Sequence, residues 1–280
     1  MAASQQITTY RDIDWQQLWE QSRAQRSWRS KDAAGWDKKA PAFASRMRDS
    51  AYVERFLQHL DLDPSLSVLD VGCGPGTLSV PLAGKVARVT AIDYSAKMLE
   101  LLREQADQAG LGNIRTVLCA WEDDWAQHDI ATYDIVIASR SLNIRNLTGG
   151  LKKLSAHAAG PIYVADRIDP SPMDADAFKA VGRPFESGPD YIYTVNILYG
   201  LGIHPRIELI EMDREQRFDS LEHALNAYTW MFKELQPDEE RLLRSYVEKQ
   251  VIASGPDYII VKRDPPQRWA LLSWNHTPNS

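Results

Sequence analysis

The residues best suited to chemistry lie in one short glycine-rich segment. Gly72, Gly74 and Gly76 alternate with other residues and follow an apolar stretch that contains Asp70. Glycine has no Cβ, so such a loop can turn sharply and bring its backbone close to a ligand. A helix that begins just after the loop would present its free N–H groups to that ligand. The spacing is GxGxG and differs from the GxGxxG of dinucleotide-binding loops, which would need glycine or alanine at Thr77.

Two acids accompany this loop and indicate the charge of the ligand. Asp70 lies two residues before the first glycine, where it would repel a pyrophosphate and attract a sulfonium or ammonium group. Asp93 ends the next apolar stretch, and its two carboxylate oxygens can accept both hydroxyls of a ribose. A strand-end Asp more often caps a helix, but Ser95 can supply that cap instead. The pattern therefore favours a positively charged sulfur nucleoside over a dinucleotide.

These residues need a parallel sheet to position them. Apolar, β-branched stretches alternate with segments of helical periodicity, which predicts an α/β fold with helices on both faces of a mostly parallel sheet. In such sheets ligands bind beyond the carboxyl ends of the strands, so functional residues should lie near 70–76, 93–95, 119–123 and 139–145. The expected strands are 67–71, 87–92, 114–119, 133–138 and 161–165, and the expected helices are 77–82, 96–109 and 150–158.

The flanking regions are expected to extend this Rossmann-like core. Residues 1–60 should form a helical N-terminal cover with helices at 14–25 and 40–60, and residues 61–168 the core. Residues 169–280 should complete the sheet and add a helical insertion before the last strand, within one structural domain. Their expected elements are an irregular loop at 169–190, helices at 191–199, 220–235 and 238–252, and strands at 206–212 and 269–274.

Composition limits the class of protein. The chain has 280 residues, of which 44% are hydrophobic and 25% charged, as in ordinary globular proteins. A net charge of −6 argues against general nucleic-acid binding. Neither a membrane-spanning stretch nor a secretory signal is recognisable. The two cysteines, Cys73 and Cys119, have no metal-ligand spacing and predict neither a disulfide framework nor a metal site, which fits the cytoplasm.

Two segments together resemble a known family. VLDVGCGPGTLSVPLA (68–83), followed by TAIDYSAKMLE (90–100), is similar to the class I S-adenosylmethionine (SAM)-dependent methyltransferases. Within these, the similarity is greatest to the small-molecule branch related to ubiquinone/menaquinone-biosynthesis methyltransferases. The upstream segment WDKKAPAF (36–43) resembles a stretch that helps to close over the cofactor in that family.

The resemblance implies SAM as the cofactor and a role for each matching position. The glycine loop would pass beneath the methionine part, Asp70 near its amino group, and Asp93 at the ribose. Ala120 occupies the place of an acid that often binds the adenine amine, so Glu122 or Asp123 would have to supply that carboxylate. The implied cofactor-binding set is Asp70, Gly72, Cys73, Gly74, Gly76, Asp93, Tyr94, Ser95, Met98, Ala120, Trp121, Glu122 and Ser139.

The sequence says less about the binding of the methyl acceptor than about the cofactor. Methyl transfer from SAM needs mainly an in-line nucleophile in a dry site, so a base is optional. The candidates for a catalytic role are Arg140, His204 and Tyr199. Arginines after the predicted strands, Arg140, Arg145, Arg167 and Arg183, suggest an anionic acceptor. The basic run of Arg23, Arg26, Arg29 and Lys31 is interpreted as a solvated face, with phosphate binding as the alternative.

Three alternatives stay open. A nucleic-acid methyltransferase of this fold commonly carries an Asn/Asp-Pro-Pro-aromatic motif after the fourth strand, where this chain has SRSL (139–142). A nicotinamide-dependent oxidoreductase would need the other glycine spacing. A non-catalytic SAM-binding protein would share the whole cofactor half. The favoured function is methyl transfer to a small molecule that is anionic or partly aromatic.

Overall fold

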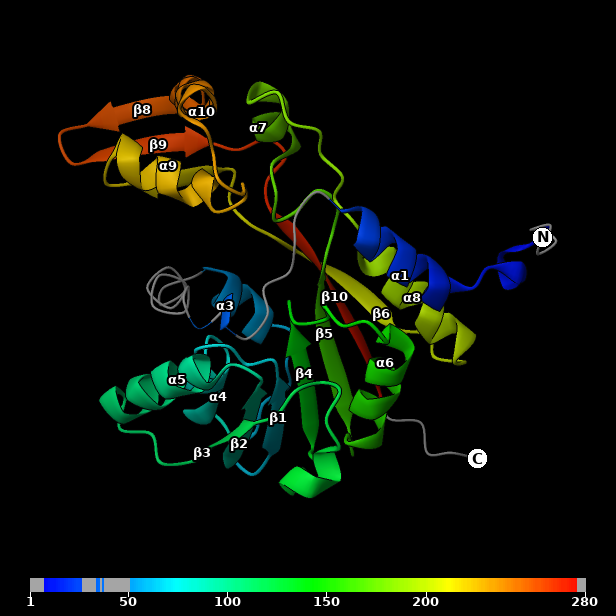
Figure 1. Ribbon diagram of the computed structural model, residues 1–280. Coiled ribbons are helices and arrows are strands. Elements are labelled where there is room, and N and C mark those ends of the chain that lie inside the picture. Colours follow the sequence, from blue (N-terminus) through cyan, green and yellow to red (C-terminus); the bar gives the residue numbers. More distant parts are fainter. Residues whose placement is uncertain (1–7, 27–33, 36, 38–50, 276–280) are drawn as a thin grey trace.

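A seven-stranded sheet forms the centre of the molecule. The computed structural model describes residues 8–26, 34–35, 37 and 51–275. In this part the strand order is β3-β2-β1-β4-β5-β10-β6. The strand β10 runs in the direction opposite to that of the other six strands (Figure 1). The predicted mostly parallel α/β fold is confirmed. The strands are β1 (Ser67–Val71), β2 (Arg88–Asp93), β3 (Ile114–Leu118), β4 (Ile135–Ser139), β5 (Pro161–Arg167), β6 (Arg206–Glu211) and β10 (Arg268–Asn275).

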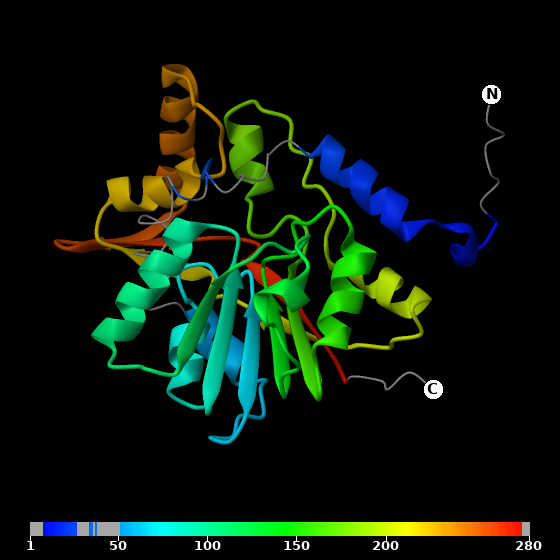
Figure 2. The same ribbon diagram turned by 60° about the horizontal axis from the view of Figure 1, so that its bottom comes forward.

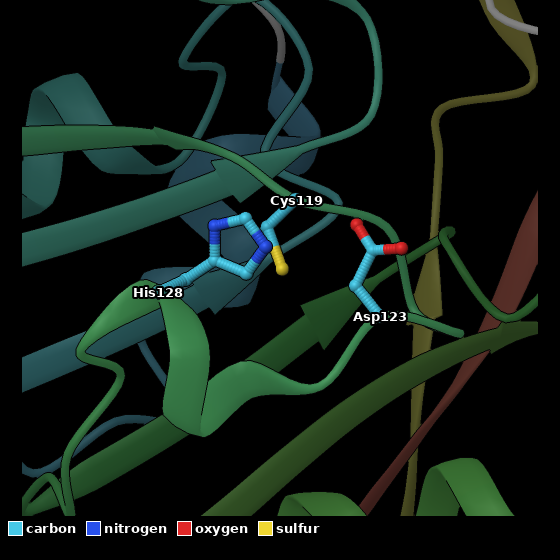
Figure 3. A group of neighbouring side chains, drawn as sticks. All are labelled: Cys119, Asp123 and His128. Atoms are coloured by element: carbon cyan, nitrogen blue, oxygen red, sulfur yellow. The ribbon is translucent and has the colours of Figure 1, made fainter.

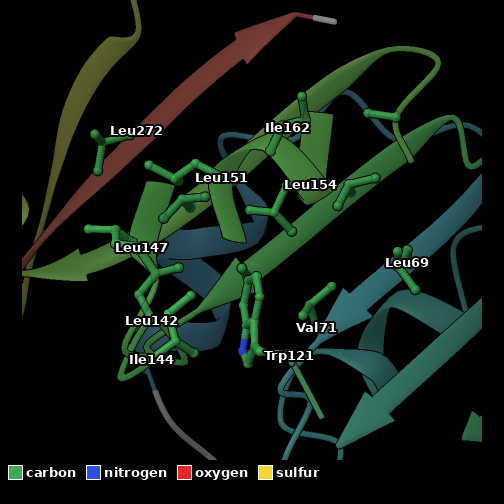
Figure 4. Close-up of a cluster of buried hydrophobic side chains, with 14 of the residues drawn as sticks. Leu69, Val71, Trp121, Leu142, Ile144, Leu147, Leu151, Leu154, Ile162 and Leu272 are labelled. Atoms are coloured by element: carbon green, nitrogen blue, oxygen red, sulfur yellow. The ribbon is translucent and has the colours of Figure 1, made fainter. Parts of the chain in front are cut away.

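Helices cover both faces of this sheet, as its apolar strands require. Every residue of β1 is buried, so neither face of that strand meets solvent. One face carries α3 (Ala51–Leu57), α4 (Ser79–Ala83) and α5 (Ala96–Gln108), and the other carries α1 (Trp15–Gln25), α6 (Leu147–Ala156) and α8 (Tyr191–Gly200) (Figures 1 and 2). Figure 4 shows the hydrophobic core on the face covered by α1, α6 and α8, in which the leucines of α6 lie over β1, β4 and β5.

The strand order creates the crevice in which a site can form. The chain winds from β1 outward to β3 and then returns to the other side of β1 to form β4. The connections that leave β1 and β4 therefore diverge at their carboxyl ends, and a hollow remains between them. The residues predicted after β1, β2, β3 and β4 all reach this edge.

The N-terminal cover is tied to the segment that follows β4. The side chain of Asp14 caps α1 by accepting the N–H of Gln17. Trp19 is buried, and its indole N–H donates to the carbonyl of Ile144 at 2.8 Å. Of the helix predicted at 40–60, the structure describes α3, and the preceding residues lie outside the described part. The bond from Trp19 therefore holds α1 beside the crevice, against the segment that follows β4.

The region after β5 contains more structure than the sequence suggested. Residues 169–190, expected to be an irregular loop, include the helix α7 (Ala175–Ala180). The insertion predicted as helical also contains a three-stranded antiparallel sheet in the order β7-β9-β8. These elements share a separate hydrophobic cluster. They are β7 (Glu215–Phe218), α9 (Leu221–Thr229), α10 (Pro237–Lys249), β8 (Val251–Gly255) and β9 (Tyr258–Lys262).

Replacing Gly76 by Ala should destabilise the fold. Gly76 has φ +91°, and an added Cβ would lie 2.8 Å from Leu102 Cγ and 3.0 Å from Val80 Cγ2. We expect the free energy of unfolding in urea to fall by about 1–3 kcal/mol. Gly112→Ala is the matched control, because nothing lies within 4 Å of its added Cβ. Equal effects at the two positions would contradict this account of Gly76.

Candidate functional site

A cavity of about 320 Å³ lies at the carboxyl edge of β1, β2 and β4. It gathers side chains and backbone that are far apart in the sequence, as the topology requires. Most of the predicted cofactor residues line it, and so does Arg140. These predicted residues are Asp70, Gly72, Cys73, Gly74, Asp93, Tyr94, Met98, Ala120, Trp121, Glu122 and Ser139.

The glycine loop forms the floor of the cavity through two different constraints. Gly72 has φ +71°, and a Cβ there would collide with Ser141 in the loop after β4. The Ser141 hydroxyl in turn donates to the carbonyl of Val71 at 2.7 Å. Gly74 has φ +55°, a left-handed conformation that glycine adopts without strain. The Ser141 side chain thus packs directly against the glycine loop, where a side chain at position 72 would not fit.

Two predicted residues do not line the cavity. Gly76 packs against Leu102 of α5, so its lack of a side chain serves the contact between loop and helix. Ser95 is buried at the N-terminus of α5, where its hydroxyl oxygen accepts the N–H of Met98 and its O–H donates to Asp37. Ser95 is therefore the helix cap that the sequence suggested, and Asp93 is released from that task.

Asp93 ties the end of β2 to the glycine loop. Its carboxylate accepts the N–H of Gly74 at 2.9 Å and that of Ser95 at 2.8 Å. The residue is 7% exposed, and it lines the cavity. Burial raises its pKa, while the backbone N–H groups of Ser95 and Gly74 act in the opposite direction. The Tyr94 N–H is a third backbone donor to this carboxylate, and a carboxylate has about four acceptor sites, so acceptor capacity is left for a ligand.

Asp70 is a buried acid that titrates near neutral pH. It is 2% exposed, and the Ser79 hydroxyl donates to it at 2.6 Å. Burial raises its pKa to about 7, and the nearby Asp93 carboxylate adds to the rise. A positively charged ligand beside Asp70 would favour its ionised form.

The wall that follows β3 contains an unsatisfied donor. The ring of Trp121 lines the cavity, and its buried Nε1–H has no hydrogen-bond partner among the described residues. Such orphan donors are rare in folded proteins and indicate a missing acceptor. Asp123 is not among the residues that line the cavity, and its carboxylate accepts the N–H of Ala120 at 2.8 Å. Glu122 is the acid of this segment that lines the cavity.

The opposite wall, after β4, contains the cation Arg140, which packs against aromatic rings that are not among the lining residues. Arg140 has φ +57°, an uncommon conformation for a residue other than glycine. Its guanidinium carbon lies 4.1 Å from the ring centroid of Tyr52 and 5.6 Å from that of Trp269. The Tyr52 hydroxyl meets Ser139 Oγ at 2.6 Å. Burial lowers the pKa of Arg140, so the stacked rings hold a desolvated cation at the cavity.

The other two candidates for a catalytic role lie elsewhere. Tyr199 is at the end of α8, is 46% exposed, and has its hydroxyl 3.2 Å from that of Tyr10. The exposed His204 packs edge-on against Tyr199. Neither residue lines the cavity. The structure places Tyr199 beside Tyr10 and His204 beside Tyr199, away from the residues that line the cavity.

The remaining predicted arginines have structural partners. Arg145 pairs with Glu20, and Arg183 pairs with Glu239. Arg167 follows β5 as expected, but it donates to backbone carbonyls of the 169–190 segment, among them that of Ser171 at 3.0 Å. These three side chains are not among the residues that line the cavity.

Some lining residues were not singled out from the sequence. Those after β4 lie within residues 139–145, where the expected topology already placed functional residues. Naming every residue of that stretch would have included them. Those after Gly76 lie in the first turn beyond the loop. The missed lining residues include Thr77, Leu78, Ser141, Asn143 and Ile144.

One group of side chains has metal-ligand chemistry although no such site was expected. Cys119, Asp123 and His128 place one donor atom each within 4.8 Å of one another (Figure 3). The thiolate is the form that binds metals, and burial raises the pKa of Cys119 to about 11. Asp123 is already bonded to the N–H of Ala120. A metal ion here would have to displace the thiol proton.

The fold and cavity define a class of enzyme, and comparison with known proteins agrees. Residues 68–158 match a family described as "Methyltransferase domain". The sheet is similar to those of BH2331 from Bacillus halodurans, a candidate methyltransferase (TM-score 0.57, 14% identity, 82% of this chain and 100% of that one), and YcgJ from Bacillus subtilis (0.52, 11%, 81% and 99%). The chain is therefore a SAM-dependent methyltransferase.

The chain belongs to the same family as an uncharacterized protein of Haemophilus influenzae. The two are 31% identical over 272 residues, which cover 96% of this chain and 98% of the relative. Shorter matches link it to a ubiquinone biosynthesis O-methyltransferase of Methylocella silvestris (38% over 80 residues, 28% of this chain and 29% of that one) and to the 23S rRNA methyltransferase RlmD of Klebsiella pneumoniae (36% over 81 residues, 27% and 19%). None of the described helices has the length and apolar character to cross a membrane.

Replacing Asp70 by Asn should change how stability depends on pH. Asp70 keeps its proton in the folded chain up to about pH 7, whereas an unfolded Asp loses it near pH ~3.9. Wild-type stability should therefore fall as pH rises through this window and stay level above it. Relative to that of the wild type, the free energy of unfolding of the D70N variant should therefore rise by about 1.4 kcal/mol per pH unit up to pH 7. Urea denaturation from about pH 5 to 8 measures this; a constant difference across that range would contradict it.

Proposed function

We propose that the cavity binds SAM and that the enzyme transfers its methyl group to a small-molecule acceptor. The observation that carries the proposal is the meeting of Asp93 with the side-chain-free backbone of Gly72 and Gly74 at the crevice beside β1. A carboxylate beside bare backbone, with an unsatisfied indole N–H from Trp121 opposite, matches a nucleoside with a charged tail.

The residues present fit each part of the cofactor. Asp93 would accept the ribose hydroxyls with the lone pairs that its backbone bonds leave. Asp70 would face the ammonium group and be held ionised by it. The apolar side chain of Met98 and the rings of Tyr94 and Trp121 would enclose the adenine, with Trp121 Nε1–H as one donor.

The chain's own contribution to the reaction is placement and exclusion of water. Bound SAM supplies a methyl group on a positively charged sulfur, which already reacts readily with a nucleophile. Arg140, whose guanidinium packs against Tyr52 and near Trp269, offers the acceptor a cation at the wall after β4. Holding the acceptor against that wall, in line with the methyl group, supplies much of the rate. This supports an acceptor that is anionic or partly aromatic.

A nucleic-acid substrate is less well supported. The rRNA methyltransferase match covers 27% of this chain and 19% of that enzyme. Ser139 ends β4, and Arg140 and Ser141 follow it, in place of the Asn/Asp-Pro-Pro-aromatic motif that grips an extruded base. The match to a ubiquinone-biosynthesis enzyme is equally short, so we propose the small-molecule class and not that particular substrate.

Asp93→Ala should weaken cofactor binding. S-adenosylhomocysteine, which keeps the ribose and adenine of SAM, is the probe for calorimetric titration. Loss of hydrogen bonds to a charged acceptor should raise its Kd at least about tenfold. Asp107→Ala, on the exposed last turn of α5, is the control and should leave the Kd unchanged. No heat with the wild-type protein would refute the proposed cavity.

Arg140→Ala should impair the acceptor side selectively. The protein is incubated with methyl-labelled SAM and a metabolite extract, and mass spectrometry identifies the labelled product. At limiting acceptor, the variant should form that product about ten- to a hundredfold more slowly, because a charged hydrogen bond is lost. Its Kd for S-adenosylhomocysteine should stay within about twofold of the wild-type value. Equal losses in both measurements would show that Arg140 maintains the cavity as a whole.

A further inference from the structure

Two arginines of the N-terminal cover converge on a residue of the cavity rim. Arg23 Nη2 lies 3.2 Å from the side-chain oxygen of Asn143, and Arg26 Nη1 lies 2.7 Å from the same atom. Arg23 also donates to the backbone carbonyl of Asn143. Asn143 lines the cavity after β4. The sequence suggested a solvated face for these arginines, but both are half-buried.

Positive charge is concentrated there. Burial, together with the neighbouring charges of Arg23 and Arg167, lowers the pKa of Arg26 to about 10. Burial also lowers the pKa of Arg23, and the negative charges of Glu122 and Glu20 partly offset this shift. Glu20 is itself paired with Arg145. Packing like charges together at a half-buried rim costs free energy that an anion would recover.

The cluster lies beside the loop after β4, where Asn143 lines the cavity. A Cβ on Gly188 would lie 2.9 Å from Arg26 Cβ, so this arginine rests on the segment that follows α7. Arg167 holds the same segment by donating to the carbonyl of Ser187. Arg26 therefore bridges the loop after β4 and the segment anchored after β5. The glycine loop and Asp93 lie on the other side, beyond β1.

The donors needed for an anion are present. Arg23 Nε–H is buried and has no hydrogen-bond partner among the described residues. A guanidinium group carries five N–H donors in a fork that matches carboxylate and phosphate oxygens. Stabilising the C-terminal end of α1 would need only basic side chains in its last turn. It would not require two guanidinium groups to share one amide oxygen across the rim.

We propose that Arg23, Arg26 and Asn143 form a subsite for a carboxylate or phosphate group of the methyl acceptor. The subsite rests on the proposed function, because it places the acceptor over β4 and β5, opposite the cofactor carboxylates. An acceptor anchored there would present its nucleophile toward Arg140 and the middle of the cavity. The enzyme would thereby select small acids or phosphate esters.

Titration of the full chain with simple anions tests the subsite. Inorganic phosphate and malonate are titrated separately by calorimetry, at low salt and with S-adenosylhomocysteine present. The variants are Arg23→Gln, Arg26→Gln and Arg26→Lys, and Arg206→Gln is the matched control. Arg206 is exposed at the start of β6, at the end of the sheet away from the carboxyl ends of the parallel strands. Thermal denaturation of each variant verifies that it folds.

At least one of the two anions should bind the wild type. Arg23→Gln and Arg26→Gln should each weaken that binding about tenfold or more, Arg26→Lys should weaken it less, and Arg206→Gln should not change it. Preference for phosphate or for malonate identifies the acceptor group, and either result supports the subsite. Absence of binding, or equal loss in the control, overturns it. Titration with S-adenosylhomocysteine alone tests the cofactor cavity, so failure of the subsite and failure of the proposed function give different results.

Discussion

The hydrogen bond from the Gly74 N–H to the buried carboxylate of Asp93 is the contact on which the site depends. It fixes a loop without side chains against the end of β2, while Ser141 closes on Gly72 from the loop after β4. The Ser141 side chain can approach the loop this closely only because Gly72 has no Cβ. The cavity between β1 and β4 exists because these two loops meet without filling the space above them.

Charge is divided between the two sides of this cavity. Asp70 and Asp93 are buried on the side of β1 and β2. Arg140 and the pair Arg23 and Arg26 lie on the side of β4 and β5. Because each group is partly desolvated, its interaction with a ligand is screened less than at an open surface. Such a division suits a cationic donor and an anionic acceptor that must be held apart until they are aligned.

The cover and the insertion give the acceptor side its shape. Trp19 anchors α1 to Ile144, which brings the arginines of that helix to the rim. Arg167 anchors the segment around α7 to the end of β5. Helical covers of this kind can differ between enzymes while the sheet stays the same, which is consistent with short matches to both small-molecule and rRNA methyltransferases.

The sequence alone determined the sheet, the glycine loop and the two acids, because apolar strands, glycine spacing and strand-end carboxylates are local patterns with local physical causes. It missed α7 and the sheet of β7, β8 and β9, which are short and are stabilised by packing against one another. Only the tertiary structure brought Arg23 and Arg26 to Asn143 and left His204 outside. Those outcomes depend on how a distant helix docks, since the contacts join residues more than a hundred positions apart, and no local pattern encodes that docking.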